Sequence, residues 1–477
     1  MRVLLVNPPW MYKRLYTHSL YPPYGLLMVA TMLARDGHDV TLLDANALDL
    51  DELQIQAEIE AHAPDALGVT VFTDTFGFLE RMGPWWRRTF PGRPFVLGGP
   101  LLSGAPEPVM RGAQADVGVI GEGFLSAPQF FNDWRRLGNW RTAAAGVPGL
   151  IVAGLDGTLK RTGATPTWDA PLDDLPRPDW EMLPVRRYLA GGPSPYFQER
   201  RLQHYLSIIT TLGCPWRCTF CQVPTLFEGV RRRSPESVAL EVAAYRDTYQ
   251  IESMYFRDDI LFRPGKIADA LAKEVPGLSW SCLLRADMIN DREVARMKAG
   301  GCAEIRVGFE SGDDAVLAHA NKKTEVADNR SCVEVCRRQG VAIAGFLIVG
   351  LPGETETSLA ATERFVLETG ARVSVHFPLP LPGTVLYDQG RQQGFIPDEA
   401  ALLRKFSEPQ LPGAVLQPPP VNYTDLSPEI LVYWAMRIAE AGRVGGPGLP
   451  VGGPERTEEA LATARIDAVL THADAPF

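Results

Sequence analysis

The sequence predicts an α/β protein with a doubly wound parallel sheet at its N-terminal end and a partial (β/α)6 barrel of the TIM type behind it. Short apolar runs alternate with helix-like stretches in the first third of the chain, and the same alternation resumes after residue 200. We expect the first sheet in residues 1–140, a linker in 141–200, the barrel in 201–385, a helical cover over the barrel mouth in 386–440, and a flexible linker with a tail helix in 441–477.

The bulk composition is that of an ordinary globular protein, with 45% hydrophobic and 22% charged residues. A formal net charge of −10 argues against a surface that binds nucleic acid. No run approaches the 18 or so apolar residues of a membrane span, and the start does not resemble a signal peptide, so we expect a cytoplasmic protein. In a reducing compartment, clustered cysteines are metal ligands or catalytic thiols rather than disulfides.

The first block contains five short apolar runs with turn residues where they end. The glycines of greatest interest, Gly98 and Gly99, follow the fourth run, and Gly121 and Glu122 follow the fifth. In parallel sheets ligands bind outside the carboxyl ends of the strands, where glycine lets a large planar ligand approach the backbone. These four residues are therefore candidate binding residues. The glycine motifs of dinucleotide and nucleoside triphosphate sites are absent from this block.

The barrel block begins with a strand that is followed at once by three cysteines, Cys214, Cys218 and Cys221, in the spacing C-x3-C-x2-C. A structural zinc site needs four protein ligands, and no fourth Cys or His is suitably spaced nearby. A [4Fe–4S] cluster held by three thiolates instead keeps one iron open for an exogenous ligand. The missing fourth thiol would then be the functional feature.

The stretch GCPWRCTFC after a barrel strand resembles the signature of the radical S-adenosylmethionine superfamily. The resemblance implies that the open iron binds S-adenosylmethionine and that a 5′-deoxyadenosyl radical removes hydrogen from a substrate. It also implies further cofactor contacts at the ends of later strands: Asp258, Asp259, Arg285, Glu310, Ser311, Gly350 and Gly353. Most of these residues also have a purely structural interpretation. The aspartates could cap a helix or pair with arginines, Arg285 could serve merely to bridge loops, and the glycines could serve turns.

The order of features in the first block, NPP, then YPPYGLLMVATMLARDGHDVTLLDA, then VLGGP, then VIGEGF, resembles the cobalamin-binding domain that precedes many radical S-adenosylmethionine enzymes. The match departs from corrinoid domains whose D-x-H-x-x-G supplies an axial histidine to cobalt. Here the nearest string places His38 between a helix and the second strand and lacks the glycine. We therefore expect His38 to be a turn residue and the lower face of any bound cobalamin not to be ligated by histidine.

Two further residues are candidates for catalysis. Cys282 lies in a predicted barrel strand, where alternation could point its thiol inward as a hydrogen donor, and His376 closes the last strand. The structural alternative for both is a place in the core. Cys302, Cys332 and Cys336 are expected to be small buried hydrophobes.

The resemblance implies C-methylation of an unactivated carbon as the leading reaction on a small molecule such as a secondary metabolite, a sugar or a lipid scaffold. Relatives with the same pair of domains instead dehydrate sugar diols, form rings or contract them, and the sequence does not separate these outcomes. An iron–sulfur redox sensor without catalysis is an alternative of another class. The usual electron donor for such a cluster is a flavodoxin or a ferredoxin.

Overall fold

The computed structural model describes residues 1–9, 21–190, 204–408 and 418–444, which belong to one compact unit, Met1–Gly445. The predicted tail helix lies outside the described residues. In the part that is described, no helix combines the length and apolarity that a membrane span requires.

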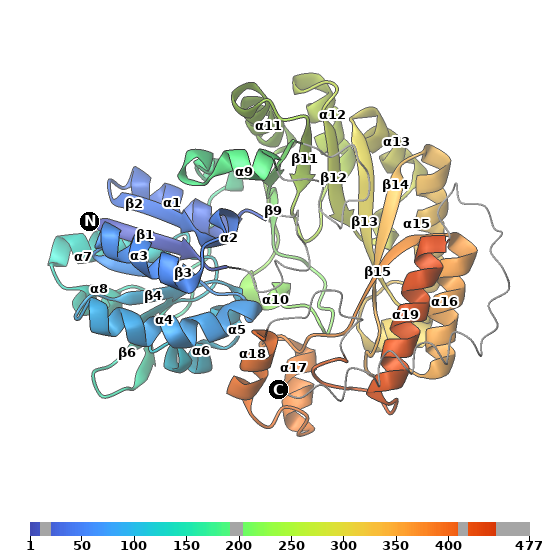
Figure 1. Ribbon diagram of the computed structural model, residues 1–477. Coiled ribbons are helices and arrows are strands. Elements are labelled where there is room, and N and C mark those ends of the chain that lie inside the picture. Colours follow the sequence, from blue (N-terminus) through green and yellow to red (C-terminus); the bar gives the residue numbers. More distant parts are fainter. Residues whose placement is uncertain (10–20, 191–203, 409–417, 445–477) are drawn as a thin grey trace. The chain divides into compact units, whose positions relative to one another are not determined.

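The first sheet has the strand order β2-β1-β3-β4-β5-β6-β7 among the described residues, and β1 to β5 are parallel (Figure 1). Its strands are β1 (Arg2–Asn7), β2 (Asp39–Asp44), β3 (Ala66–Thr70), β4 (Phe95–Gly98), β5 (Val117–Val119), β6 (Leu150–Ala153) and β7 (Leu159–Arg161). The helices of this block are α1 (Tyr24–Arg35), α2 (Ala45–Leu48), α3 (Glu52–His62), α4 (Phe76–Thr89), α5 (Pro100–Gly104), α6 (Pro106–Gly112), α7 (Ser126–Leu137) and α8 (Trp140–Gly146).

Both faces of this sheet are buried, as a doubly wound fold requires. Val3 and Leu5 of β1 pack in one core with residues of α1 and α7, whereas Leu4 and Val6 pack in a second core with residues of α3 and α4. This split explains why β1 is apolar throughout instead of alternating with polar residues.

One boundary differs from the prediction. The first sheet does not stop near residue 140, because β6 and β7 add an antiparallel hairpin to its edge from within the predicted linker. The hairpin was missed because its short strands, four and three residues long, lie among glycines and prolines that favour turns.

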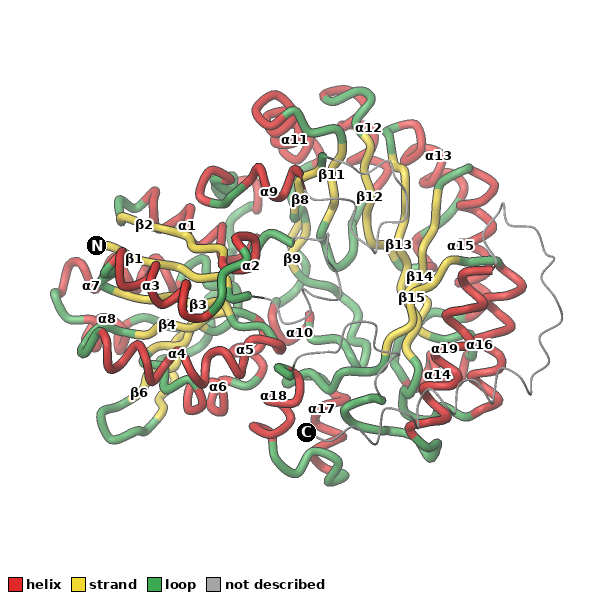
Figure 2. Tube along the Cα trace, viewed as in Figure 1, coloured by secondary structure: helices red, strands yellow, loops and turns green. Residues whose placement is uncertain are grey.

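The second sheet has the order β15-β14-β13-β12-β11-β8 in the described part of the chain, and every pair is parallel (Figure 2). Its strands are β8 (Tyr205–Ile208), β11 (Ser253–Phe256), β12 (Ser279–Leu284), β13 (Cys302–Glu310), β14 (Ala342–Ile348) and β15 (Arg372–His376). The helices α11 (Pro235–Tyr249), α12 (Pro264–Glu274), α13 (Asp291–Ala299), α14 (Asp314–His319), α15 (Val326–Gln339) and α16 (Glu356–Thr369) separate them. The edge strands β8 and β15 do not pair, so the barrel is partial as predicted.

The remaining elements lie outside the two large sheets and the helices that separate their strands. They are α9 (Val185–Ala190), β9 (Thr211–Leu212), α10 (Val223–Leu226), β10 (Arg231–Arg232), α17 (Val385–Gln392), α18 (Glu399–Phe406) and α19 (Pro428–Val444). The predicted cover over the barrel mouth is only partly right. Residues of α18 share a core with α4, and Arg404 forms an ion pair with Glu80 at 2.8 Å, whereas α19 packs on β15 and α16.

Candidate functional site

The three clustered cysteines lie in a loop that leaves β9 and enters α10, at the carboxyl end of the barrel strands. Gly213, which opens the loop, has φ +85°, and a Cβ there would lie 2.1 Å from the carbonyl oxygen of Gly229. Any side chain at Gly213 would therefore push the two arms of the loop apart. The position of Cys214 depends on this close approach.

Backbone contacts fix the middle of the cysteine loop independently of its thiols. The N–H of Thr219 donates to the carbonyl of Ala320 at 3.0 Å, and the N–H of Leu386 donates to the carbonyl of Thr219 at 2.9 Å. The side-chain amide of Asn321 donates to the carbonyl of Arg217 at 2.7 Å. Segments from α14 and α17 thus hold the loop on two sides.

The thiols of Cys214, Cys218 and Cys221 are half-buried and close enough to raise one another's pKa. Burial is the main cause of the raised pKa in each, and it raises the pKa of Cys221 to about 12. Among the described residues, no three His, Cys, Asp or Glu side chains converge closely enough to ligate one metal ion. A cubane cluster does not need that convergence, because each thiolate binds a different iron, so these residues fit a [4Fe–4S] cluster better than zinc.

Arg285 bridges loops and does not point free into the site. Its guanidinium donates to Asp287 at 3.0 Å and to the carbonyl of Lys322 at 2.7 Å, and it lies 4.2 Å from the ring of Trp216 in the cysteine loop. The predicted pairing with a cofactor carboxylate would have to displace these contacts. We therefore assign Arg285 to positioning the loop.

The neighbouring aspartates divide into one structural and one exposed carboxylate. Asp258 accepts hydrogen bonds from the backbone N–H and the hydroxyl of Thr210, at 2.6 and 2.8 Å, and also from the N–H of Thr211, so it anchors the strand that leads into the loop. Asp259 is exposed at the rim of the site and lies near Cys214 and Cys221, whose pKa it helps to raise. Of the two, only Asp259 is available to a ligand.

A β-bulge at the end of β13 directs Glu310 into the site. The pairing register with β14 shifts between Gly308 and Glu310, and Glu310 adopts φ +61°, which is unusual for a residue with a side chain. Its carboxylate pairs with Lys322 at 2.7 Å, and both side chains are buried. A Cβ on Gly308 would lie 2.2 Å from that carboxylate, so Gly308 makes room for the pair.

Lys322 is a site residue that sequence reasoning missed. It lies close to Cys218, where its charge opposes the effect of burial on the pKa of that thiol. The loop after α14 carries it, and nothing in its spacing marks it as part of the site. Ser311, by contrast, faces α16, where its hydroxyl lies 3.3 Å from that of Thr362, so it holds the strand end in place.

The predicted glycines Gly350 and Gly353 form a turn with φ +100° and +80°. The buried Glu354 accepts the N–H of Gly350 and closes this turn. Leu351, inside the turn, belongs to a small core against which Phe220 of the cysteine loop packs. The aromatic residue before the last cysteine therefore connects the loop to the glycine turn.

Burial raises the pKa of Glu354 from its usual 4.5 to about 8. The folded protein keeps this carboxyl protonated up to about pH 8, while the unfolded chain ionises it near 4.5, so rising pH favours unfolding across that window. We expect Glu354→Gln to raise the melting temperature relative to wild type by an amount that grows from pH 5 to pH 8. The exposed Glu58→Gln is the control, and an equal effect of both substitutions at every pH would contradict the assignment.

The two predicted catalytic residues have different surroundings. His376 ends β15 beside the ring of Phe346. Burial lowers its pKa, and the charge of Glu310 opposes that shift, so His376 lies within electrostatic reach of Glu310. Cys282 is fully buried, and its thiol contacts Cys302 inside the core. A hydrogen-donor role for Cys282 has no support in this position, because the thiol lacks access to a ligand.

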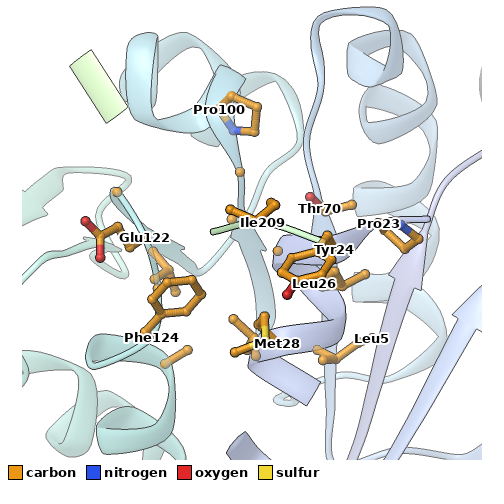
Figure 3. A pocket seen from close by; sticks show the side chains of 18 of the residues that line it. Leu5, Pro23, Tyr24, Leu26, Met28, Thr70, Pro100, Glu122, Phe124 and Ile209 are labelled. Carbon is orange, nitrogen blue, oxygen red and sulfur yellow. The ribbon is translucent and has the colours of Figure 1, made fainter. Parts of the chain in front are cut away.

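A pocket of about 360 Å³ lies at the carboxyl ends of the first sheet (Figure 3). The predicted residues Gly98, Gly99, Gly121 and Glu122 all line it, and Figure 3 shows Tyr24, Met28, Phe124 and Ile209 facing the same space. A Cβ on Gly98 would meet no atom within 4 Å, so the missing side chain widens the pocket. Glu122 itself is paired with Arg231.

No histidine lines this pocket within the described residues. His38 precedes β2 at the opposite end of the strands, is buried, and lies 3.1 Å from Asn132. It is a turn residue, as the sequence predicted. The pocket would therefore accommodate a planar ligand through its glycines and apolar walls, without an axial histidine among the described residues.

The pocket and the cysteine loop share a wall. Leu226 and Phe227, which closely follow Cys221 in the chain, line the pocket. Gln222, next to Cys221, donates to the carbonyls of Pro100 at 3.3 Å and Pro382 at 2.8 Å.

Comparison with known families agrees with this geometry. Residues 208–366 match the Radical SAM superfamily, and residues 16–130 match the B12 binding domain. The chain contains a radical SAM domain and a B12-binding domain. The first match covers the cysteine loop and the strand ends with Glu310 and Gly350, and the second covers the glycines of the pocket, Gly98, Gly99 and Gly121.

The relatives of this radical SAM enzyme differ in the reactions their names describe. An uncharacterized methyltransferase of Pyrococcus horikoshii is 28% identical over 81% of this chain and 83% of its own length. An anaerobic magnesium-protoporphyrin IX monomethyl ester cyclase of Rubrivivax gelatinosus is 26% identical over 76% of this chain and 65% of its own.

Among solved structures, the radical S-adenosylmethionine methyltransferase TsrM of Kitasatospora setae has a TM-score of 0.67 at 22% identity, over 83% of this chain and 77% of its own. The cobalamin-dependent enzyme OxsB has a TM-score of 0.63 at 16% identity, over 85% of this chain and 56% of its own. These likenesses confirm the predicted fold class. The two domains imply a [4Fe–4S] cluster, S-adenosylmethionine and cobalamin as cofactors.

Proposed function

We propose that this radical SAM enzyme is a cobalamin-dependent C-methyltransferase that acts on an unactivated C–H bond of a small molecule. One observation supports the pairing of the two cofactors in a single reaction: the segment that follows Cys221 is also a wall of the glycine-lined pocket. A redox sensor, or a first domain that does not bind cobalamin, would need no such shared wall. Relatives named as methyltransferases support the same reaction.

In this proposal, Cys214, Cys218 and Cys221 hold the cluster, and Gly98, Gly99 and Gly121 border the corrinoid. Together these cofactors and S-adenosylmethionine supply a carbon radical and a methyl group. Asp259, Glu310 and Lys322 would orient S-adenosylmethionine through its amine, ribose and carboxylate, respectively, because each supplies the complementary charge or acceptor at the site. His376 would border the substrate, and its lowered pKa keeps the imidazole neutral near pH 7.

The second candidate reaction is cyclisation, which is supported by the similarity to the cyclase of Rubrivivax gelatinosus. The product formed from S-adenosylmethionine distinguishes methylation from cyclisation. The reconstituted, cobalamin-loaded protein is incubated under reducing conditions with S-adenosylmethionine. We expect S-adenosylhomocysteine beside 5′-deoxyadenosine, since methyl transfer consumes one S-adenosylmethionine. If only 5′-deoxyadenosine forms with a fully loaded protein, the methyltransferase proposal fails and the cyclase-type alternative remains.

The pocket assignment has its own test. We expect Gly98→Val to raise the Kd for cobalamin by about tenfold or more, which corresponds to roughly 1.4 kcal/mol, because the side chain would fill space that the glycine keeps open. Gly146→Val, at an exposed glycine with equally open surroundings but outside the pocket, is the matched control. Absorbance titration measures both, and equal affinity of the Gly98 variant and wild type would place cobalamin elsewhere.

A further inference from the structure

A row of stacked side chains leads from the cysteine loop to the surface of the barrel. Trp216, between Cys214 and Cys218, stacks on Phe262 with ring centroids 6.0 Å apart and planes at 14°. The guanidinium of Arg232 lies 4.4 Å from the ring of Phe262. At the inner end Arg285 is 2% exposed, whereas Arg232 at the outer end is exposed.

The outer end of this row carries positive charge. Arg232 and Arg263, the residue after the half-buried Phe262, are exposed, and the cysteine loop adds the exposed Arg217. None of these three arginines forms an ion pair with another described residue. The exposed acids nearest in the chain are Asp259, Glu228 and Glu236. In a chain with a net charge of −10, such a group of unpaired cations stands out from its surroundings.

We propose that Arg232, Phe262 and Arg263 form the docking surface for an acidic one-electron carrier protein, of the flavodoxin type, that reduces the cluster. The inference rests on the proposed radical function. Unpaired arginines attract an acidic partner over several ångströms and set its orientation. The stacked rings of Phe262 and Trp216 then lie between the docked carrier and the three cysteines.

The electron balance of the docked complex is simple. One electron leaves the reduced flavin of the carrier and enters the cluster, and no bond forms or breaks between the two proteins. The surface has to bind only transiently, because the carrier must leave to be reduced again. A small charged patch with an aromatic centre suits such a short-lived contact, since charged rims affect association rate more than residence time.

The test compares two reductants of different size on the reconstituted full-length protein. Flavodoxin, reduced by its reductase and NADPH, must dock, whereas dithionite reaches the cluster without docking. We expect the double variant Arg232→Glu/Arg263→Glu to raise the KM for flavodoxin at least about tenfold, roughly 1.4 kcal/mol, in 5′-deoxyadenosine formation. The rate with dithionite should stay within about twofold of wild type. The wild-type KM should rise with salt and that of the variant should not.

The control variant Arg88→Glu/Lys160→Glu changes the net charge equally at exposed positions of the first domain. Its KM for flavodoxin should match wild type. The docking proposal is overturned if the double variant keeps the wild-type KM, if the control shows the same rise, or if flavodoxin fails to support turnover that dithionite supports. Absence of 5′-deoxyadenosine with dithionite in the wild type would instead refute the radical function itself.

Discussion

Replacing Cys214, Cys218 or Cys221 singly by alanine is expected to abolish formation of 5′-deoxyadenosine while the protein stays folded. Two thiolates do not hold a cubane cluster that keeps one iron open, so the loss should exceed about a thousandfold, roughly 4 kcal/mol in barrier terms. The fold should survive because hydrogen bonds to the backbone of Thr219 and Arg217 hold the loop without the thiols.

Iron content and 5′-deoxyadenosine are measured after anaerobic reconstitution, with circular dichroism as the check on folding. Cys336→Ala is the matched control, because it removes a thiol that is fully buried in the core and away from the loop. That variant should lose some stability and keep its cluster. A loop variant that still cleaves S-adenosylmethionine would show that the cluster is held elsewhere.

The second large effect is expected at Gly213, where alanine should remove most of the cluster. A left-handed backbone costs a residue with a side chain about 1–2 kcal/mol. In addition, the new Cβ would lie 2.1 Å from the carbonyl oxygen of Gly229, an atom that moves only with the backbone of the loop. Cys214, the next residue, would be displaced with it.

The loop supplies its own control for this substitution. Gly229 has φ +69°, so Gly229→Ala carries a similar backbone cost, but its Cβ would meet no atom within 4 Å. We expect Gly229→Ala to bind close to four irons per chain and Gly213→Ala to bind less than about a tenth of that. Equal iron content in the two variants would contradict the role given to the close approach.

Much of the fold follows from local pattern. The two mainly parallel sheets, the partial barrel and the place of the cysteines after an early barrel strand follow from the alternation of apolar runs and helices. The N-terminal cap of α11 also follows from local sequence, because the side chain of Ser234 accepts the N–H of Ser237 and Pro235 begins the helix. The β6–β7 hairpin did not follow, since its strands gain their stability from the edge of a sheet that local sequence does not reveal.

The candidate site likewise contains residues that the sequence predicts and residues that it does not. The cysteines and the pocket glycines are recognisable because their spacing and their place at strand ends carry the information. The partners of Arg285, Asp258 and Lys322 depend on which loops contact one another in the folded protein, and local sequence does not predict these contacts. Burial decided against Cys282, because three successive residues of its strand, Trp280 to Cys282, are buried and its thiol lies beside Cys302 in the core.

The central claim, that the cysteine loop holds a cluster which cleaves S-adenosylmethionine to a radical, has one direct test. The full-length protein is reconstituted anaerobically with iron and sulfide, reduced with dithionite and mixed with S-adenosylmethionine, and the nucleoside products are quantified. We predict about four irons per chain and steady formation of 5′-deoxyadenosine. A protein that carries its full complement of iron and yields no 5′-deoxyadenosine would contradict the claim.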